Sequence, residues 1–235
     1  MAPLIPLLSL QSVSRRFGSF QAVQDVTIEF GPDDLNCIIG PNGAGKSTLL
    51  NMICGTLPVS SGSILFGDHD LNRLSRHQIA SLGSARKFQV PSVFPSLTVR
   101  ENLVVATGNR ETQERLSALA KTVQLESMLD VSASELSHGQ TQWLEIGMAL
   151  ATNPKVLLLD EPTAGLSPDE TQATASFLRE LRGKVTVVVI EHDMAFVRDI
   201  RAKTVVLHYG EIIATGAFDD IQNNDLVRDV FLGRR

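Results

Sequence analysis

One stretch decides the fold: Gly40-Pro41-Asn42-Gly43-Ala44-Gly45-Lys46-Ser47-Thr48 matches the phosphate-binding pattern G-x-x-x-x-G-K-[S/T] in full. Leu35-Asn36-Cys37-Ile38-Ile39 before it predicts a short buried strand, and Ser47 to Ile53 predict the first turns of a helix. The glycines allow a tight turn that aims backbone N–H groups at one point, at the positive end of that helix. Lys46 would then reach the β- and γ-phosphates of a nucleotide, and the Ser47 hydroxyl would bind Mg²⁺. The alternative is a glycine-rich turn that binds nothing.

Length and composition indicate one folded, acidic protein. The chain has 235 residues, of which 43% are hydrophobic and 20% charged, enough for one large α/β domain with its own core. The net charge of −5 argues against binding to the phosphate backbone of nucleic acid. Cys37 and Cys54 lack metal-ligand spacing and are predicted to be reduced core thiols of a cytoplasmic protein. No run is predicted to span a bilayer, and the apolar residues 1–8 are not predicted to be a signal peptide.

Two further strands are predicted before the phosphate loop. Apolar and polar residues alternate over Ser9 to Arg15 and over Ala22 to Phe30, as they do in antiparallel strands. Phe17 lies in the loop between them, where an aromatic ring could stack on a nucleotide base. A residue that only packs is an equal alternative for a lone aromatic side chain.

A glutamine loop and a helical region follow. Gln89 comes after a predicted strand and just before two prolines, where its amide could contact Mg²⁺ or a water molecule. A solvated side chain is the alternative. From about Thr98 to Asn153 the strand pattern is absent and apolar residues recur at helical spacing. This region predicts a helical subdomain inserted into the α/β core.

A second candidate anion site begins a long predicted helix. Ser137-His138-Gly139-Gln140 combines a serine with a glycine at the helix start, where backbone N–H groups are free to bind an anion. An ordinary helix cap is the alternative. If the helical lobe stands apart from Lys46, the two sites could hold the same phosphates only across a dimer.

Two buried strands end in candidate catalytic residues. The apolar run Val156 to Leu159 leads into Asp160 and Glu161, at the strand end where open α/β sheets bind their ligands. Asp160 would hold Mg²⁺ through water, and Glu161 would act as general base on the attacking water. A pair of solvated acids is the alternative. His192 follows the next apolar strand, where it would either donate to a γ-phosphate or serve only the structure.

The order of these motifs resembles that of the nucleotide-binding subunits of ATP-binding-cassette (ABC) transporters over nearly the whole chain. The resemblance implies an α/β fold for residues 1–235, with a P-loop NTPase core of the ABC ATPase type, an antiparallel β subdomain and an inserted helical subdomain at approximately 98–153. It assigns Gly40 to Thr48 to the Walker A motif, Gln89 to the Q-loop and Phe17 to the base-stacking position. It assigns the remaining motifs to the signature (Ser137, His138, Gly139, Gln140), Walker B (Asp160), the catalytic glutamate (Glu161) and the switch histidine (His192).

The same resemblance implies cofactors and partners. In the family, two subunits bind two ATP molecules head to tail, each between the Walker A motif of one chain and the signature of the other. It therefore implies ATP and Mg²⁺ as cofactors and a second ATP-binding subunit, either a copy or a sister chain. Membrane permease subunits would hold the protein on the inner face of the cell membrane, with residues 90–95 contacting a cytoplasmic permease helix.

Departures from the family pattern narrow the prediction. His138 replaces a usual glycine of the signature, where it could clash with the partner's γ-phosphate or donate to it, and Ala164-Gly165-Leu166-Ser167 replaces a usual Ser-Ala-Leu-Asp. The latter segment resembles importers of branched-chain amino acids and amides, and Leu136 to Met148 is similar to urea importers. The sequence thus predicts an ATPase that powers import of urea or short amides. The alternatives are an amino-acid importer, an exporter, a soluble cassette ATPase acting on nucleic acid or the ribosome, and a P-loop kinase or GTPase.

Overall fold

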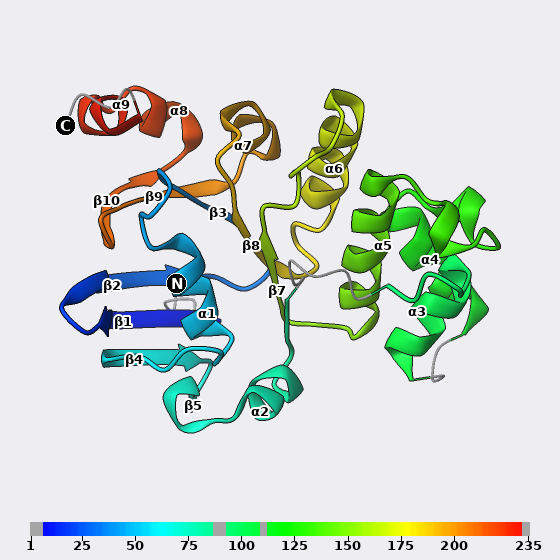
Figure 1. The fold of residues 1–235 in the computed structure, drawn as a ribbon, viewed down its shortest axis with the longest axis horizontal. Helices are drawn as coiled ribbons and strands as arrows, with labels where there is room; N and C mark the ends of the chain where they lie inside the picture. The colour runs from blue at the N-terminus through cyan, green and yellow to red at the C-terminus, as the bar shows by residue number, and fades with distance from the viewer. Residues whose placement is uncertain (1–6, 87–92, 109–111, 232–235) are drawn as a thin grey trace.

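The computed structural model describes residues 7–86, 93–108 and 112–231, which form two sheets and surrounding helices (Figure 1). The smaller sheet is antiparallel, with strand order β2-β1-β4-β5. Its long strands are β1 (Leu8–Phe17) and β2 (Phe20–Phe30), and β4 (Ser61–Phe66) and β5 (His69–Asp70) complete it. The predicted antiparallel pair before the phosphate loop is therefore correct.

The larger sheet carries the nucleotide-binding motifs. Its order is β10-β9-β3-β8-β7-β6, and every neighbouring pair is parallel except β9 with β10. The central strands β3, β7 and β8 are buried at every position, because helices or the small sheet cover both faces. The strands span Leu35–Ile39 (β3), Ser84–Arg86 (β6), Val156–Asp160 (β7), Thr186–Ile190 (β8), Lys203–His208 (β9) and Glu211–Gly216 (β10).

Side-chain caps set the start of the longer helices. Thr98, Ser137 and Ser167 each accept a hydrogen bond from the third residue of the helix, whose Glu or Gln side chain returns to the cap. The α-helices span Lys46–Ile53 (α1), Arg76–Ser81 (α2), Val99–Thr107 (α3), Gln113–Thr122 (α4), His138–Ala151 (α5), Pro168–Glu180 (α6), Met194–Ile200 (α7), Phe218–Gln222 (α8) and Asp225–Phe231 (α9). Short 3-10 turns lie at Leu71–Arg73, Glu126–Met128 and Ala133–Glu135.

Apolar burial on both faces of the large sheet holds these layers together. On one face α1 lies between the two sheets, and its buried Leu50 and Ile53 share a core with Phe30 and Phe66 of the small sheet. Burying each such side chain contributes about 1.5–3 kcal/mol. On the other face the core continues into α3, α4 and α5, which stand together beside β7 in Figure 1. The phosphate-loop helix is therefore fixed by packing on two sides.

Some boundaries and elements differ from expectation. Helix α6 ends at Glu180, and Leu181 is its C-terminal cap. Helix α7 was not predicted at all, because seven residues give too short a periodic pattern. Among the described residues, no helix has both the length and the apolar character needed to cross a bilayer.

Candidate nucleotide-binding and catalytic site

The phosphate loop connects β3 to α1 and is packed too tightly for side chains at two of its glycines. A Cβ atom on Gly40 would lie 2.1 Å from the carbonyl oxygen of Leu207, and one on Gly45 would lie 2.4 Å from that of Ala22. Both residues also have positive φ angles, 155° and 102°, which favour glycine. Each sheet therefore presses a backbone carbonyl against the loop, which gives the predicted glycines a steric reason.

Lys46, the first residue of α1, lies folded back over the phosphate loop. Its Nζ donates to the carbonyl oxygens of Gly40 at 2.6 Å and Pro41 at 3.1 Å. Burial lowers the pKa of the ammonium group, and the nearby carboxylates of Glu161, Asp160 and Glu191 oppose this shift. A phosphate at this position would meet a cation already held at the centre of the loop.

Asp160 ends β7, and it is paired with an arginine that the sequence analysis did not single out. Nη2 of Arg86 lies 3.2 Å from Oδ2 of Asp160, and Nη1 donates to Oδ1 of Asn51 in α1 at 2.6 Å. Burial raises the pKa of Asp160, whereas the guanidinium of Arg86 opposes the shift. A carboxylate such as that of Asp160 and a hydroxyl such as that of Ser47 are the hard oxygen ligands that suit Mg²⁺.

Glu161 and His192 come together at the ends of the two central strands β7 and β8. Oε1 of Glu161 lies 3.5 Å from Nδ1 of His192, and both side chains remain open to solvent. Glu161 adopts a left-handed backbone conformation with φ of 49°, and its N–H donates to the carbonyl oxygen of Ile190. A non-glycine residue in this region is strained, and such strain is frequent at functional sites.

The fully buried Glu191 was not assigned a role from the sequence, although it links the loops that carry Glu161 and His192. Its Oε1 accepts from both the backbone N–H and the hydroxyl of Thr163, and its Oε2 accepts from the N–H of His192 at 3.0 Å. An acid directly after a buried strand was the available signal. This carboxylate holds the segment after β7 against the segment after β8.

Ser137 of the signature segment caps α5, and this segment also contacts α6. The hydroxyl of Ser137 donates to Oε1 of Glu170 at 3.0 Å, in addition to capping the helix. A Cβ atom on Gly139 would lie 2.4 Å from the same oxygen, so a larger residue there would require the Glu170 side chain to shift. In Figure 1, β7 and β8 lie between α1 and α5, so the signature and the phosphate loop are in different parts of the fold.

His138 is turned toward its own chain, onto the loop after Glu161. Its Nε2 lies 3.2 Å from the carbonyl oxygen of Ala164 and 3.0 Å from Nε2 of Gln142. Gln142 donates to the same carbonyl at 2.8 Å, and Gly165 leaves room for the imidazole ring. The two departures from the family pattern, His138 and the Ala164-Gly165 segment, therefore pack against each other.

The structure says less about the other two predicted site residues, Phe17 and Gln89. Phe17 is 42% exposed at the end of β1, and the guanidinium carbon of Arg15 lies 4.6 Å from its ring centroid. One face of the ring is therefore occupied by a cation. Gln89 lies outside the described residues. The base-stacking role of Phe17 and the metal-binding role of Gln89 stay predictions.

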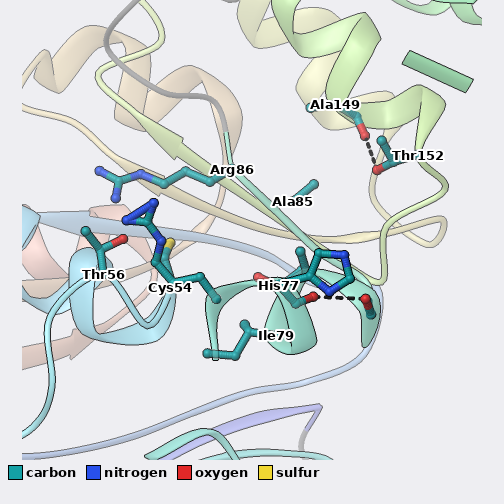
Figure 2. A pocket seen from close by; sticks show the side chains of 12 residues that line it. Cys54, Thr56, His77, Ile79, Ala85, Arg86, Ala149 and Thr152 are labelled. Atoms are coloured by element: carbon teal, nitrogen blue, oxygen red, sulfur yellow. Dashed lines mark hydrogen bonds between the residues drawn. The ribbon is translucent and has the colours of Figure 1, made fainter. Parts of the chain in front are cut away.

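A cavity of 460 Å³ lies beside the phosphate-loop helix, between α1, α2, β6 and α5 (Figure 2). Arg86, Cys54 and Thr56 line one side of it, and Ala149 and Thr152 line the side formed by α5. Burial raises the pKa of the Cys54 thiol to about 11, so the group stays protonated and unreactive at neutral pH. Cys37 is fully buried, and its pKa is also raised by burial, as expected for a core thiol.

Comparison with known protein families identifies the family of this chain. The family model described as ABC transporter matches residues 23–164, which include the phosphate loop, the signature segment and Glu161. The chain belongs to the ABC transporter family. This ABC protein is an ATP-binding-cassette ATPase, and it couples ATP hydrolysis to transport. The recognised family and the predicted fold class are therefore confirmed.

Full-length relatives support the assignment. The ABC protein is 37% identical to the high-affinity branched-chain amino acid transport ATP-binding protein LivG of Escherichia coli K12, over 97% of this chain and 98% of the relative. It is 34% identical to the corresponding protein BraF of Pseudomonas aeruginosa, with the same coverage. A crystal structure of an ABC transporter cassette in its ADP conformation superimposes with a TM-score of 0.87 at 30% identity, covering 97% of this chain and 99% of that one.

Proposed function

We propose that this chain is the ATP-binding subunit of an importer of the branched-chain amino acid group. The observation that carries the proposal is similarity over 97% of the chain to proteins named as ATP-binding subunits of branched-chain amino acid transport. The sequence analysis favoured urea, on the segment Leu136 to Met148. The names of the relatives support amino acids better, so urea and short amides become the second candidate.

The catalytic roles follow from the chemistry of the groups around the phosphate loop. Lys46 and the loop N–H groups from Gly40 to Thr48 would bind the β- and γ-phosphates of ATP. Glu161 would accept a proton from the attacking water, and His192, 3.5 Å from its carboxylate, would orient Glu161 and donate to the γ-phosphate. Ser47, Asp160 and Gln89 would hold Mg²⁺, which when bound neutralises charge on the phosphates.

A second ATP-binding subunit would complete each site. Ser137, His138, Gly139 and Gln140 begin α5, which lies beyond β7 and β8 from the phosphate loop of the same chain in Figure 1. The free N–H groups at this helix start would therefore bind the phosphates of a partner's ATP. The partner is a copy of this chain or a sister chain.

Phe94 is the described residue best suited to contact a permease. Its side chain is 47% exposed, yet its backbone is held on both sides by the fully buried Asn102, which accepts from Phe94 N and donates to Phe94 O. A rigidly held, exposed aromatic residue suits a protein interface. We place the permease contact here, on residues 93–95, which would keep the protein on the inner face of the membrane. The helical segment 98–153 would move as a subdomain with it.

Uptake measurements in a strain lacking the native chain test the cargo. Complementation with the intact chain should restore uptake of labelled leucine, whereas Lys46→Ala should not. Loss of urea uptake with leucine uptake unchanged would replace the amino-acid proposal by the urea alternative. Recovery of ribosomes or DNA, but of no membrane protein, with the purified chain would favour the soluble alternative over any importer.

A further inference from the structure

Arg86 occupies a buried position between the two strands and the helix that carry the proposed metal site. Its guanidinium contacts Asp160 of β7 through Nη2 and Asn51 of α1 through Nη1. The side chains of Arg86 and Asp160 are only 10% and 2% exposed. One cation therefore connects β6, β7 and the helix that follows the phosphate loop.

The backbone explains why these two residues meet. Strands β6 and β7 are parallel neighbours, and Arg86 is in register with Leu158. Asp160 lies two residues beyond Leu158 and therefore on the same face of the sheet. Arg86 is the last residue of its strand, so its long side chain can extend past the strand end and reach the carboxylate.

The Asp160 carboxylate needs a cation when no metal is bound. Removing a carboxylate from water is costly unless an opposite charge accompanies it. The amine of Lys46 is engaged with the loop carbonyls of Gly40 and Pro41. Among the described residues, Asp160 forms its ion pair with Arg86.

We propose that Arg86 is a positioning residue that supplies, in the nucleotide-free protein, the positive charge that Mg²⁺ supplies to Asp160 when the nucleotide is bound. This inference rests on the proposed role of Asp160 as a metal ligand. Arg86 keeps the carboxylate in place before loading. Because it carries like charge to the metal, it also raises the Mg²⁺ concentration that loading requires.

The cavity beside Arg86 gives its side chain room to move away from Asp160. Figure 2 shows Arg86 extending along one edge of the 460 Å³ cavity, near Cys54 and Thr56 at the end of α1. The guanidinium can therefore shift toward this space without displacing the packed core. When Mg²⁺ binds, Arg86 would move away from Asp160, so that one cation replaces the other beside the carboxylate.

A Mg²⁺ titration tests the exchange directly. Binding of a fluorescent N-methylanthraniloyl derivative of ADP to the full chain is followed as MgCl₂ is added. In Arg86→Gln the half-saturating Mg²⁺ concentration should fall by about tenfold, because a neighbouring like charge is removed. Arg86→Lys should resemble the intact chain. Arg76→Gln is the matched control, since Arg76 is an exposed arginine on the same cavity. If the half-saturating Mg²⁺ concentration of Arg86→Gln equals or exceeds that of the intact chain, the proposal is overturned.

Thermal unfolding without nucleotide and with EDTA gives a second readout. Arg86→Gln should lower the melting temperature, while Arg86→Gln combined with Asp160→Asn should be no less stable than Asp160→Asn alone, because the two side chains act as a pair. Equal melting temperatures for Arg86→Gln and the intact chain would contradict the pairing. If the Gln variant does not fold, Arg86→Lys and the double variant carry the comparison.

Asp160→Asn separates this inference from the proposed function. An unchanged Mg²⁺ requirement in Asp160→Asn would refute Asp160 as a metal ligand, and the role of Arg86 with it. If Asp160→Asn raises the Mg²⁺ requirement but Arg86→Gln leaves it unchanged, only the role of Arg86 is refuted.

Discussion

Glu191→Gln should weaken both the fold and the catalytic site, although it removes only a charge. The intact carboxylate accepts from Thr163 with Oε1 and from the N–H of His192 with Oε2, and the residue is fully buried. A glutamine oxygen can still serve Thr163, but its NH₂ group would then face the N–H of His192, donor against donor. One unmet buried donor costs about 1–3 kcal/mol. For a chain of this size the melting temperature should fall by roughly 2–12 °C.

Chemical unfolding in urea measures the loss of stability, and steady-state ATP hydrolysis measures the loss of positioning. We expect kcat to fall with KM little changed, because Glu191 holds the loops of Glu161 and His192 through hydrogen bonds to Thr163 and to the His192 backbone. Glu180→Gln, at the exposed end of α6, is the control for removing a carboxylate. If Glu191→Gln loses no more stability than this control and keeps its kcat, Glu191 does not hold the two loops together.

Three further changes probe the phosphate loop and its surroundings. Glu161→Gln should lower kcat by about 10²–10⁴-fold while ATP binding persists, as comparison of turnover with equilibrium binding would reveal. Gly45→Ala should abolish nucleotide binding, since its Cβ would lie 2.4 Å from the carbonyl oxygen of Ala22; calorimetric binding equal to that of the intact chain would contradict the steric argument. His138→Gly should remove the packing of the imidazole ring against Ala164 and Gly165 and speed amide hydrogen exchange in the loop after Glu161; unchanged exchange would mean that His138 does not fix that loop.

Local chemistry explains what the sequence analysis predicted well. The phosphate loop, the buried strands β3, β7 and β8, and the helix start at Ser137 follow from glycine geometry, apolar runs and helix-capping residues, which are all short-range patterns. The family resemblance then joined these pieces into an ABC cassette, and the family model confirms that step.

Contacts between distant segments could not be predicted in the same way. Asn51, Arg86 and Asp160 meet because of strand register and the position of α1, and no local pattern marks Arg86 as their link. The orientation of His138 was open for the same reason, since its partner Ala164 lies 26 residues away. The cargo was predicted from a single segment, and the full-length relatives favour the alternative.

The bond between Ser137 and Glu170 bears on how strongly two subunits attract each other. An isolated chain already satisfies its signature hydroxyl with a carboxylate oxygen at 3.0 Å. In the proposed dimer, that hydroxyl exchanges one anionic acceptor for another, so only the difference between the two bonds contributes to association. Subunits without ATP then have little to gain at this point by meeting. The lifetime of the dimer would therefore depend on the ATP concentration. Without ATP, the two ATP-binding subunits of the proposed transporter would be separated.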